Sequence, residues 1–278
     1  MLIAQTSRGP ARIEGPQILL LDVGERTLGD LVVDGRLNDL RTAEVVEQID
    51  KSEVSFMSPV NRPGKFLIVG LNYKDHAEEI GAQPPTGVRF SYGPGSAIAG
   101  PDSAIVLPAI APNQVDYEGE VAVVIGSAAT CVSKDEAWRH VAGLTVANDV
   151  SARDVQLGRH PRSQGVNVGL GKGFPTFKPL GPAMLVTGDR GPGTDFTVTT
   201  RVDGEIRQSS STAAMFFDIP TIVAVVSQFC RLDAGDVILT GTPGGVAESD
   251  ANYLKAGQLV EVEVDGIGTL RNRVVTAA

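Results

Sequence analysis

Residues 116–125 read DYEGEVAVVI, so Asp116, Glu118 and Glu120 alternate with uncharged residues before an apolar run. Successive side chains of a β-strand point to opposite faces, and the stretch therefore predicts a strand with two or three carboxylates on one face. Like charges held that close raise each other's pKa, so a buried cluster needs a cation to stay ionised. The stretch thus indicates a metal site. The alternative is an acidic sheet face in contact with solvent, since any half-exposed strand alternates in this way, and the spacing alone favours neither.

A further carboxylate is expected beside this strand. Asp149 ends the apolar segment 141–148, where a second strand would place it close to the first. Carboxylates are hard oxygen donors, and neither cysteine nor histidine lies among the candidates. Such a set favours magnesium, manganese or calcium over zinc or copper. We therefore hypothesise a site for one of these three ions.

The composition limits the class of protein. A chain of 278 residues with 42% hydrophobic content has room for one large domain, or for a large and a small one. The balance of 24 basic and 33 acidic residues gives a net charge of -9 without a basic cluster, which argues against nucleic acid and anionic membranes as partners. There is no charged-then-apolar leader and no apolar run of about 18 residues. Cys131 and Cys230 form no disulfide framework, so we expect a soluble, cytoplasmic protein.

Short apolar runs alternate along the chain with few helical patterns, which predicts a strand-dominated α+β fold. The expected strands are 18–22, 29–33, 66–70, 104–108 and 236–240. The expected helices are 43–49, 74–80, 135–141 and 221–229. Asp203-Gly204 and Asp265-Gly266 predict the turns of two hairpins. Two segments, 81–101 and 156–173, are rich in glycine and are expected to be loops.

Proline and glycine near residue 60 predict a boundary between two units. We expect a small N-terminal α/β subdomain at 1–60 and a larger domain at 61–278.

His76 and Glu79 are spaced by three residues, so on a helix they share a face and their side chains can touch. A carboxylate beside a histidine fixes its tautomer and stabilises the imidazolium, and such a dyad can act as a general base. The alternative is a surface histidine beside two glutamates, which this short stretch alone favours.

Lys172 lies in the sequence GLGKG, which fails the Walker pattern. It is either a cation that meets an anionic substrate or an ordinary solvated lysine. The chain also contains no dinucleotide fingerprint, no G-x-S-x-G elbow and no H-E-x-x-H motif. These absences argue against nucleotide enzymes, serine hydrolases of that type and zinc proteases.

Five motifs together resemble the fumarylacetoacetate hydrolase family, in the family's order and approximate spacing over about residues 65–275. The motifs are VGLNYKDHAEE at 69–79, DYEGE at 116–120, NDVSARD at 148–154, Lys172 with FPTF at 174–177, and GTPGGV at 241–246.

The resemblance implies a mixed β-sandwich roll that is usually a homodimer, with one magnesium or calcium ion at its centre. The family's metal ligands correspond here to Glu118, Glu120 and Asp149. Its histidine–glutamate dyad corresponds to His76 and Glu79, on a segment that resembles a lid. The remaining family positions correspond to a substrate-anchoring Lys172 and to substrate contacts at Tyr92, Arg153, Gln156 and Thr242.

This chain departs from the family pattern around the expected pocket. Tyr92 stands where relatives generally carry a lysine, and Pro175 replaces an acidic residue. The stretch 156–172 also lacks a tryptophan that is often found there. These changes remove a cation and an anion, so the substrate could also be less charged than a dicarboxylate.

The resemblance implies a hydrolase that needs Mg²⁺, Mn²⁺ or Ca²⁺ and cleaves a carbon–carbon bond in a 1,3-dicarbonyl substrate through a metal-bound enolate. The substrate would be acylpyruvate-like or a less charged diketone. Decarboxylation and keto–enol tautomerisation or isomerisation on the same scaffold are alternatives, as is a non-catalytic, metal-stabilised binding protein. No nucleotide or organic cofactor is expected.

Overall fold

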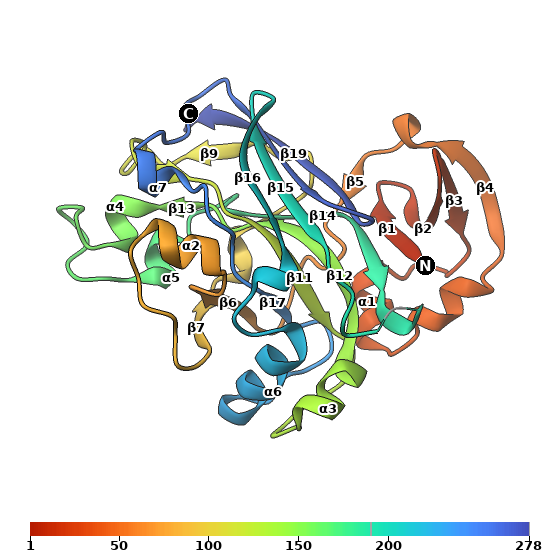
Figure 1. Cartoon of the computed structure of the whole chain (residues 1–278). Coiled ribbons are helices and arrows are strands. Elements are labelled where there is room, and N and C mark those ends of the chain that lie inside the picture. Colours follow the sequence, from red (N-terminus) through yellow and green to blue (C-terminus); the bar gives the residue numbers. More distant parts are fainter. Residues whose placement is uncertain (190, 278) are drawn as a thin grey trace.

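The computed structural model describes residues 1–189 and 191–277. Strands dominate these residues, and most of them belong to two sheets (Figure 1). This agrees with the strand-dominated α+β fold expected from the sequence.

The larger sheet has twelve strands. Its order is β4 (Val45–Asp50), β3 (Gln17–Leu21), β2 (Gly9–Glu14), β1 (Leu2–Thr6), β14 (Lys178–Val186), β12 (Val141–Asn148), β11 (Gly119–Ile125), β17 (Val237–Leu239), β6 (Phe66–Gly70) and β7 (Arg89–Gly93), with β5 (Phe56–Met57) beside β1 and β8 (Ile98–Ala99) beside β14.

A five-stranded sheet lies against it. Its order is β16 (Glu205–Ser211), β15 (Thr197–Val202), β18 (Leu259–Val264), β19 (Gly268–Thr276) and β9 (Ile105–Leu107), and a separate short pair is formed by β10 (Val115–Asp116) and β13 (Ser151–Ala152).

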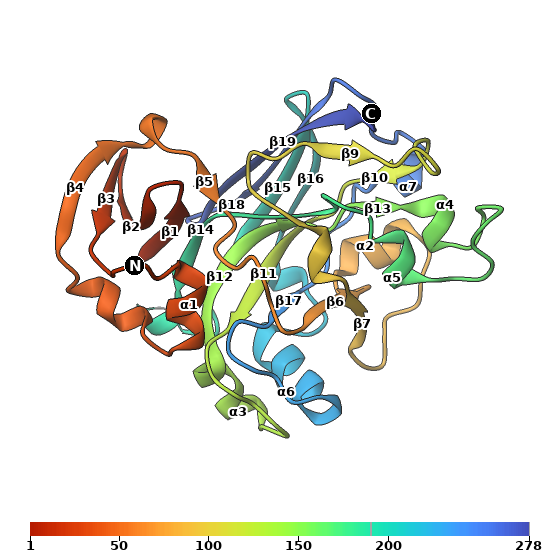
Figure 2. The same ribbon diagram turned by 180° about the vertical axis from the view of Figure 1, so that it is seen from behind.

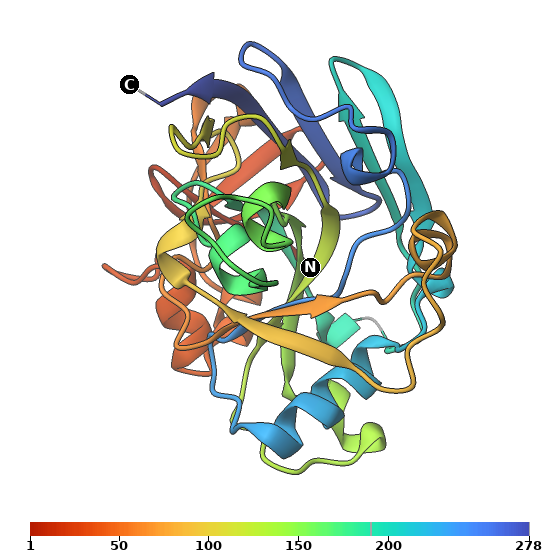
Figure 3. The ribbon, with the colours of Figure 1, turned by 90° about the vertical axis from the view of Figure 1, so that its left-hand side faces the viewer.

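The helices are short. They are α1 (Leu28–Val33), α2 (Lys74–Glu79), α3 (Lys134–Ala137), α4 (Arg153–Gln156), α5 (Val168–Gly171), α6 (Ile219–Phe229) and α7 (Ala247–Asp250). Helices α1 and α6 contribute side chains to the cores on opposite faces of the larger sheet. Turns of 3-10 helix occur at Leu37–Arg41, Lys51–Glu53, Gly95–Ala97, Trp138–His140, Thr187–Asp189 and Thr212–Ala214. In the side view of Figure 3, α6 lies at the opposite end from the C-terminal strands β18 and β19.

Strand β11 connects two hydrophobic cores because its side chains alternate between the faces of the larger sheet. Val121 and Val123 belong to the core shared with the five-stranded sheet. Ala122 and Val124 belong to a second core, which contains Leu31 of helix α1. Since all of these side chains are buried, the strand that carries the acidic motif is held rigidly from both faces.

The N-terminal strands continue the larger sheet, because β1 pairs with β14. Figure 2 shows β1 to β4 at one side of the molecule. Ile18 and Ile49 of these strands belong to a small separate core. The division of the chain near residue 60 stays a prediction.

Two elements predicted in this N-terminal part were wrong. Residues 29–33 were predicted to be a strand but belong to helix α1, which begins with a capping box formed by Thr27 and Asp30. Residues 43–49 were predicted to be a helix, but residues 45–50 form strand β4, which pairs with β3. In both places a short apolar run fits either period, and the capping residues or the strand partner decide between them.

The other predicted elements were largely confirmed, including both hairpins and the strands at 66–70 and 236–240. Helix α6 begins after Asp218, whose side chain accepts a hydrogen bond from the backbone N–H of Thr221. Both segments predicted to be loops contain regular structure: 81–101 contains strand β7, and 156–173 contains the short helix α5. Among the described residues, no helix has both the length and the apolar character needed to cross a membrane.

Candidate active site

Four neighbouring strands of the larger sheet, β6, β17, β11 and β12, have one of their ends on the same side of the sheet, at one edge. Strands β6 and β17 are parallel and both end there, while β11, antiparallel to β17, begins there and β12 ends there. Helices α2, α4, α5 and α7 gather at this end of the molecule, far from the N-terminal strands (Figure 1). In open sheets the ends of parallel strands are the usual place for a ligand.

Three buried carboxylates converge at this edge. Glu118 directly precedes β11, Glu120 is its second residue, and Asp149 directly follows β12. One carboxylate oxygen from each residue lies within 4.8 Å of the corresponding oxygens of the other two. The residues are 5%, 1% and 0% exposed, which excludes the solvated acidic face that the spacing left open.

Asp116 does not join this group. The chain leaves the strand geometry between β10 and β11, so the expected alternation places two of the three carboxylates of the motif together. The carboxylate of Asp116 accepts hydrogen bonds from Arg153 Nε (2.8 Å) and from the backbone N–H groups of Ala247 (2.8 Å) and Glu248 (3.0 Å). It therefore fixes Arg153 and the start of helix α7.

Two glycines allow close packing around the acidic strand. A Cβ atom on Gly119 would lie 2.2 Å from Thr200 Oγ1 of the facing sheet. Gly241 has a φ of +99°, which favours glycine, and its backbone N–H donates to Glu120 Oε2 at 2.6 Å. The spacing of the Glu-Gly-Glu motif thus follows from the contact between the two sheets.

The electrostatic environment separates the two glutamates. Burial raises the pKa of Glu120 well above its ordinary value, and the charges of Asp149 and Glu118 raise it further. Burial acts in the same direction on Glu118, but Arg153 and Lys172 outweigh it and lower the pKa of Glu118 below its ordinary value. Arg153 and Lys172 therefore balance the negative charge of Glu118, whereas the negative charge of Glu120 is not balanced.

Two buried lysines contact the carboxylates. The ammonium group of Lys172 is in contact with Glu118 Oε2 and Asp149 Oδ2. Lys178 Nζ lies 2.7 Å from Asp149 Oδ1, the other oxygen of the same carboxylate. Lys172 is 5% exposed, so the interpretation of it as an ordinary solvated lysine was wrong. Lys178 was not predicted from the sequence, because a lysine directly before Pro179 has no period or motif that indicates burial.

Helix α2 carries the predicted dyad. His76 Nδ1 lies 3.4 Å from Glu79 Oε2, and the two side chains are 12% and 21% exposed. The carboxylate of Glu79 also accepts from the backbone N–H of Gly245, at 2.9 Å and 3.1 Å, so its orientation is fixed. The structure brings the dyad together with its histidine largely buried rather than on an open surface.

The entry to helix α2 depends on Asn72, which is fully buried. Its amide nitrogen donates to the carbonyls of Thr240 (2.8 Å) and Phe217 (3.0 Å), and its oxygen accepts from the backbone N–H of Phe217 (2.9 Å). One side chain thus joins the segments that follow β6 and β17.

Asn72→Ala is expected to lower the free energy of unfolding by about 2–4 kcal/mol, because it leaves several buried backbone groups without partners. Urea denaturation followed by circular dichroism measures this change. A matched loss of polar contact at an exposed position, Asn252→Ala, should change stability by less than about 0.5 kcal/mol. Equal stabilities of the two variants would contradict the role assigned to Asn72.

A cavity of about 580 Å³ opens at the acidic cluster. Its lining includes His76, Glu118, Glu120 and Lys172, so the base candidate, two carboxylates and the ammonium group face one space. Its walls are largely apolar and include Val69, Leu71 and Phe90.

Three of the four expected substrate contacts line this cavity, namely Arg153, Gln156 and Thr242. Arg153 Nη2 donates to Glu118 Oε1 (2.6 Å) and Nη1 to Gln156 Oε1 (2.9 Å). Tyr92, the fourth, is not among the lining residues, is 57% exposed and lies edge-on to Phe90. Its contact with substrate stays a prediction. Arg89 also lines the cavity and was not singled out from the sequence.

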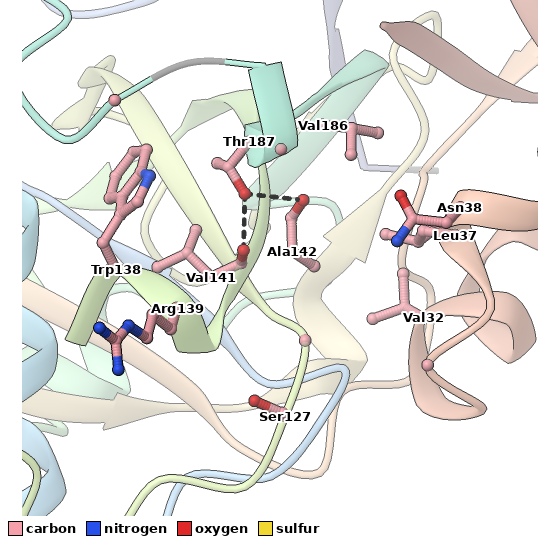
Figure 4. Close-up of a pocket in the computed structure, with 14 residues that line it drawn as sticks. Val32, Leu37, Asn38, Ser127, Trp138, Arg139, Val141, Ala142, Val186 and Thr187 are labelled. Atoms are coloured by element: carbon pink, nitrogen blue, oxygen red, sulfur yellow. Dashed lines mark hydrogen bonds between the residues drawn. The ribbon is translucent and has the colours of Figure 1, made fainter. Parts of the chain in front are cut away.

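A second cavity, of about 430 Å³, lies between the 3-10 turn at 37–41 and the ends of β12 and β14 (Figure 4). Thr187 Oγ1 donates there to the carbonyls of Val141 (2.6 Å) and Ala142 (3.2 Å). Its described lining contains no acidic residue, histidine, cysteine or lysine. It therefore offers neither a ligand set for a metal ion nor an acid–base pair.

The acidic cluster fits a hard divalent cation. Its donors are carboxylate oxygens, the chemistry that magnesium, manganese and calcium prefer. Glu120 is buried among like charges, and a divalent ion is what would allow all three carboxylates to stay ionised together. Buried carboxylates, an ammonium group and a histidine around one cavity place the site in the class that can hold a divalent ion beside an acid–base residue.

The comparison with known families identifies the group within this class. Residues 65–275 match the family described as fumarylacetoacetate (FAA) hydrolase C-terminal. The chain belongs to the fumarylacetoacetate hydrolase family, which confirms the resemblance drawn from the five motifs.

Individual relatives carry different names. The chain is 39% identical over 271 residues to the Bos taurus protein named oxaloacetate tautomerase FAHD2A, mitochondrial, and the match covers 94% of this chain and 85% of that one. The structure of a fumarylacetoacetate hydrolase from Exiguobacterium antarcticum superimposes with a TM-score of 0.85 at 32% identity over 100% of both chains. Maleylpyruvate hydrolase from Sphingobium sp. SYK-6, solved with manganese(II) and pyruvate, gives a TM-score of 0.79 at 26% identity, also over 100% of both chains.

Proposed function

We propose that the protein is a divalent-metal-dependent keto–enol tautomerase that acts on a small 2-oxo dicarboxylate such as oxaloacetate. The observation that carries the proposal is the shared cavity: His76 and Lys172 line the same space as two carboxylates of the buried acidic cluster. Removal of a proton next to a ketone requires a base on one side and positive charge at the oxygen where negative charge develops. These residues supply both.

In this proposal Glu118, Glu120 and Asp149 hold one divalent ion. When bound, the ion supplies Lewis-acid polarisation of a substrate oxygen. The ammonium group of Lys172, already among these carboxylates, donates hydrogen bonds toward the same oxygen and stabilises its negative charge.

His76 is the base in this reaction. Its Nε2 accepts a proton from the methylene carbon next to the substrate ketone, while Glu79 stabilises the imidazolium that forms. The imidazolium of His76 then gives this proton to the former ketone oxygen and becomes neutral again, so the keto and enol forms interconvert without a net gain or loss of protons. No water, oxidant or other reactant is consumed. The apolar walls of the cavity keep bulk water from competing for the proton.

Hydrolytic cleavage of a carbon–carbon bond is the second candidate. The dyad that removes a proton from carbon can also remove one from water, and a solved relative is named maleylpyruvate hydrolase. The tautomerase is favoured because the Bos taurus relative, with higher identity over 94% of the chain, carries the name oxaloacetate tautomerase.

One set of assays separates these functions. Ultraviolet absorbance follows the enol of oxaloacetate with Mg²⁺, with Mn²⁺ and with a chelator. The proposal expects metal-dependent acceleration of the keto–enol exchange. Release of pyruvate from an acylpyruvate without that acceleration would identify the hydrolase instead, and carbon dioxide from oxaloacetate would identify a decarboxylase. If the protein binds these compounds or an uncharged diketone but converts none of them, it is the non-catalytic, metal-stabilised binding protein.

Arg89 supports a doubly charged substrate. It lies at the start of strand β7, lines the cavity, and has no ion pair within residues 1–189 and 191–277. It stands three residues before Tyr92 on this strand and, unlike Tyr92, lines the cavity, so it supplies a cation to the cavity wall itself.

Arg89→Gln is expected to raise the KM for oxaloacetate about tenfold with little change in kcat. A hydrogen bond to a charged group is worth about 1.5–3 kcal/mol, and the exposure of Arg89 places its contribution at the lower end of that range. Steady-state kinetics measures the two constants. Arg159→Gln is the matched control, since Arg159 lines the same cavity but is paired with Glu248. An equal KM for wild type and Arg89→Gln would remove Arg89 from substrate recognition.

The homodimer and the cytoplasmic location stay predictions. Analytical ultracentrifugation tests the first. For the second, the relative from Bos taurus carries a mitochondrial name, so the compartment of this protein requires its own localisation experiment.

A further inference from the structure

Lys178 is a fully buried charge that the proposed reaction does not use. It is the first residue of strand β14 and is 0% exposed. Its Nζ lies 2.7 Å from Asp149 Oδ1 and donates to the backbone carbonyls of Phe177 (3.0 Å) and Val150 (3.2 Å). A buried ammonium group is strongly destabilising unless a nearby charge and hydrogen bonds compensate for it, so its presence requires an explanation.

The two lysines approach Asp149 from different sides. Lys172 lines the active-site cavity and contacts Asp149 Oδ2, whereas Lys178 is not among the residues that line the cavity and contacts Oδ1. A substrate or an ion that enters the cavity therefore meets Lys172 and leaves Lys178 behind the carboxylate.

The charges around the cluster show what Lys178 adds. Arg153 is shared between Glu118 and Asp116, so its charge is balanced by a carboxylate outside the cluster. Lys172 is placed to contact substrate. Among the described residues that contact the cluster, Lys178 is the cation committed to one cluster carboxylate alone, and it is held there by two backbone carbonyls.

We propose that Lys178 is a built-in counter-cation of the metal site, which balances one of the three negative charges from behind Asp149. The inference rests on the proposed metal-binding role of Glu118, Glu120 and Asp149. Lys178 and a divalent ion then both offset the negative charge of the three carboxylates. The lysine stabilises the cluster when no ion is bound, and it weakens the affinity for the ion by repulsion between like charges.

Lys178→Met tests this, because methionine retains much of the apolar stem and removes the charge. Metal-free Lys178→Met is expected to unfold at a lower temperature than the wild type. Mn²⁺ should raise the unfolding temperature of the variant more than that of the wild type, since binding to the folded state stabilises it in proportion to affinity. In isothermal titration calorimetry, Mn²⁺ should bind the variant at least about tenfold more tightly.

Lys65→Met is the matched control. Lys65 Nζ also pairs with a fully buried carboxylate, Asp236, at 2.8 Å, but it precedes β6 at the end of that strand away from the acidic cluster. Its loss should lower the unfolding temperature equally with and without Mn²⁺ and leave Mn²⁺ affinity unchanged. Lys178→Gln serves as a second variant if Lys178→Met does not fold, and both are refolded with and without Mn²⁺.

Mn²⁺ affinity that is unchanged or weaker in both variants at Lys178 would overturn the inference, as would a loss of stability that Mn²⁺ does not relieve. These readouts need no turnover. If the wild-type protein binds no Mn²⁺, the proposed metal site itself fails; if the wild type binds Mn²⁺ and the variants bind no more tightly, only the role of Lys178 fails.

Discussion

His76→Ala is expected to lower kcat for oxaloacetate tautomerisation by about 100- to 10,000-fold, the range that a positioned general base contributes. The imidazole is the titratable group of helix α2 that faces the cavity, and Glu79 holds it in place at 3.4 Å. Because the ion-pair partner of His76 is Glu79 and not a carboxylate of the acidic cluster, the affinity for Mn²⁺ should stay close to the wild-type value. Steady-state kinetics and calorimetry measure the two quantities on one preparation.

Glu78→Ala on the same helix is the control, since Glu78 is exposed to solvent and should leave both quantities unchanged. A wild-type kcat in His76→Ala would show that another group removes the proton. A large loss of Mn²⁺ affinity would show instead that helix α2 supports the metal site.

Glu120→Gln is expected to lower Mn²⁺ affinity more than about 100-fold and to reduce metal-dependent turnover to near the uncatalysed rate, because it removes a charged ligand rather than a supporting group. The same change should stabilise the metal-free protein. Glu120 is 1% exposed and lies beside Asp149 and Glu118, whose charges oppose its own. Relief of that repulsion should raise the unfolding temperature by roughly 2–4 °C for each kcal/mol gained.

The combination of lower affinity and higher metal-free stability is what distinguishes a metal ligand from an ordinary structural glutamate. Glu263→Gln removes a half-exposed partner of Arg201 in the five-stranded sheet and should change neither quantity measurably. Wild-type Mn²⁺ affinity in Glu120→Gln, or a lower unfolding temperature of its metal-free form, would contradict the ligand role.

The sequence allowed the central part of the site to be predicted because its chemistry is encoded locally. Glu118 and Glu120 share an apolar strand, and Asp149 follows a second apolar segment that pairs with it in antiparallel register. His76 and Glu79 have helical spacing and do lie on one helix. The two-residue period of a strand was sufficient to predict the first pair, and the three- to four-residue period of a helix was sufficient to predict the second.

Other features depend on tertiary contacts that no period encodes. Asp116 has the same alternation as Glu118 but lies outside the cluster, where it accepts from the backbone N–H groups of Ala247 and Glu248, because the strand is interrupted between β10 and β11. The burial of Lys178 follows from the position of β14 beside β12. The strand at 45–50 also requires its neighbour β3, since five of its six residues are exposed and its own pattern resembles a surface helix.

The central claim is that one divalent ion binds between Glu118, Glu120 and Asp149 at the edge of the larger sheet. A crystal structure of the protein grown with Mn²⁺, with data collected at the manganese absorption edge, tests this most directly. The account predicts one strong anomalous peak within coordination distance of all three carboxylates, with the Lys172 ammonium displaced from Glu118 and Asp149 toward the cavity. No peak at these carboxylates, with Lys172 still seated between them at saturating Mn²⁺, would contradict it.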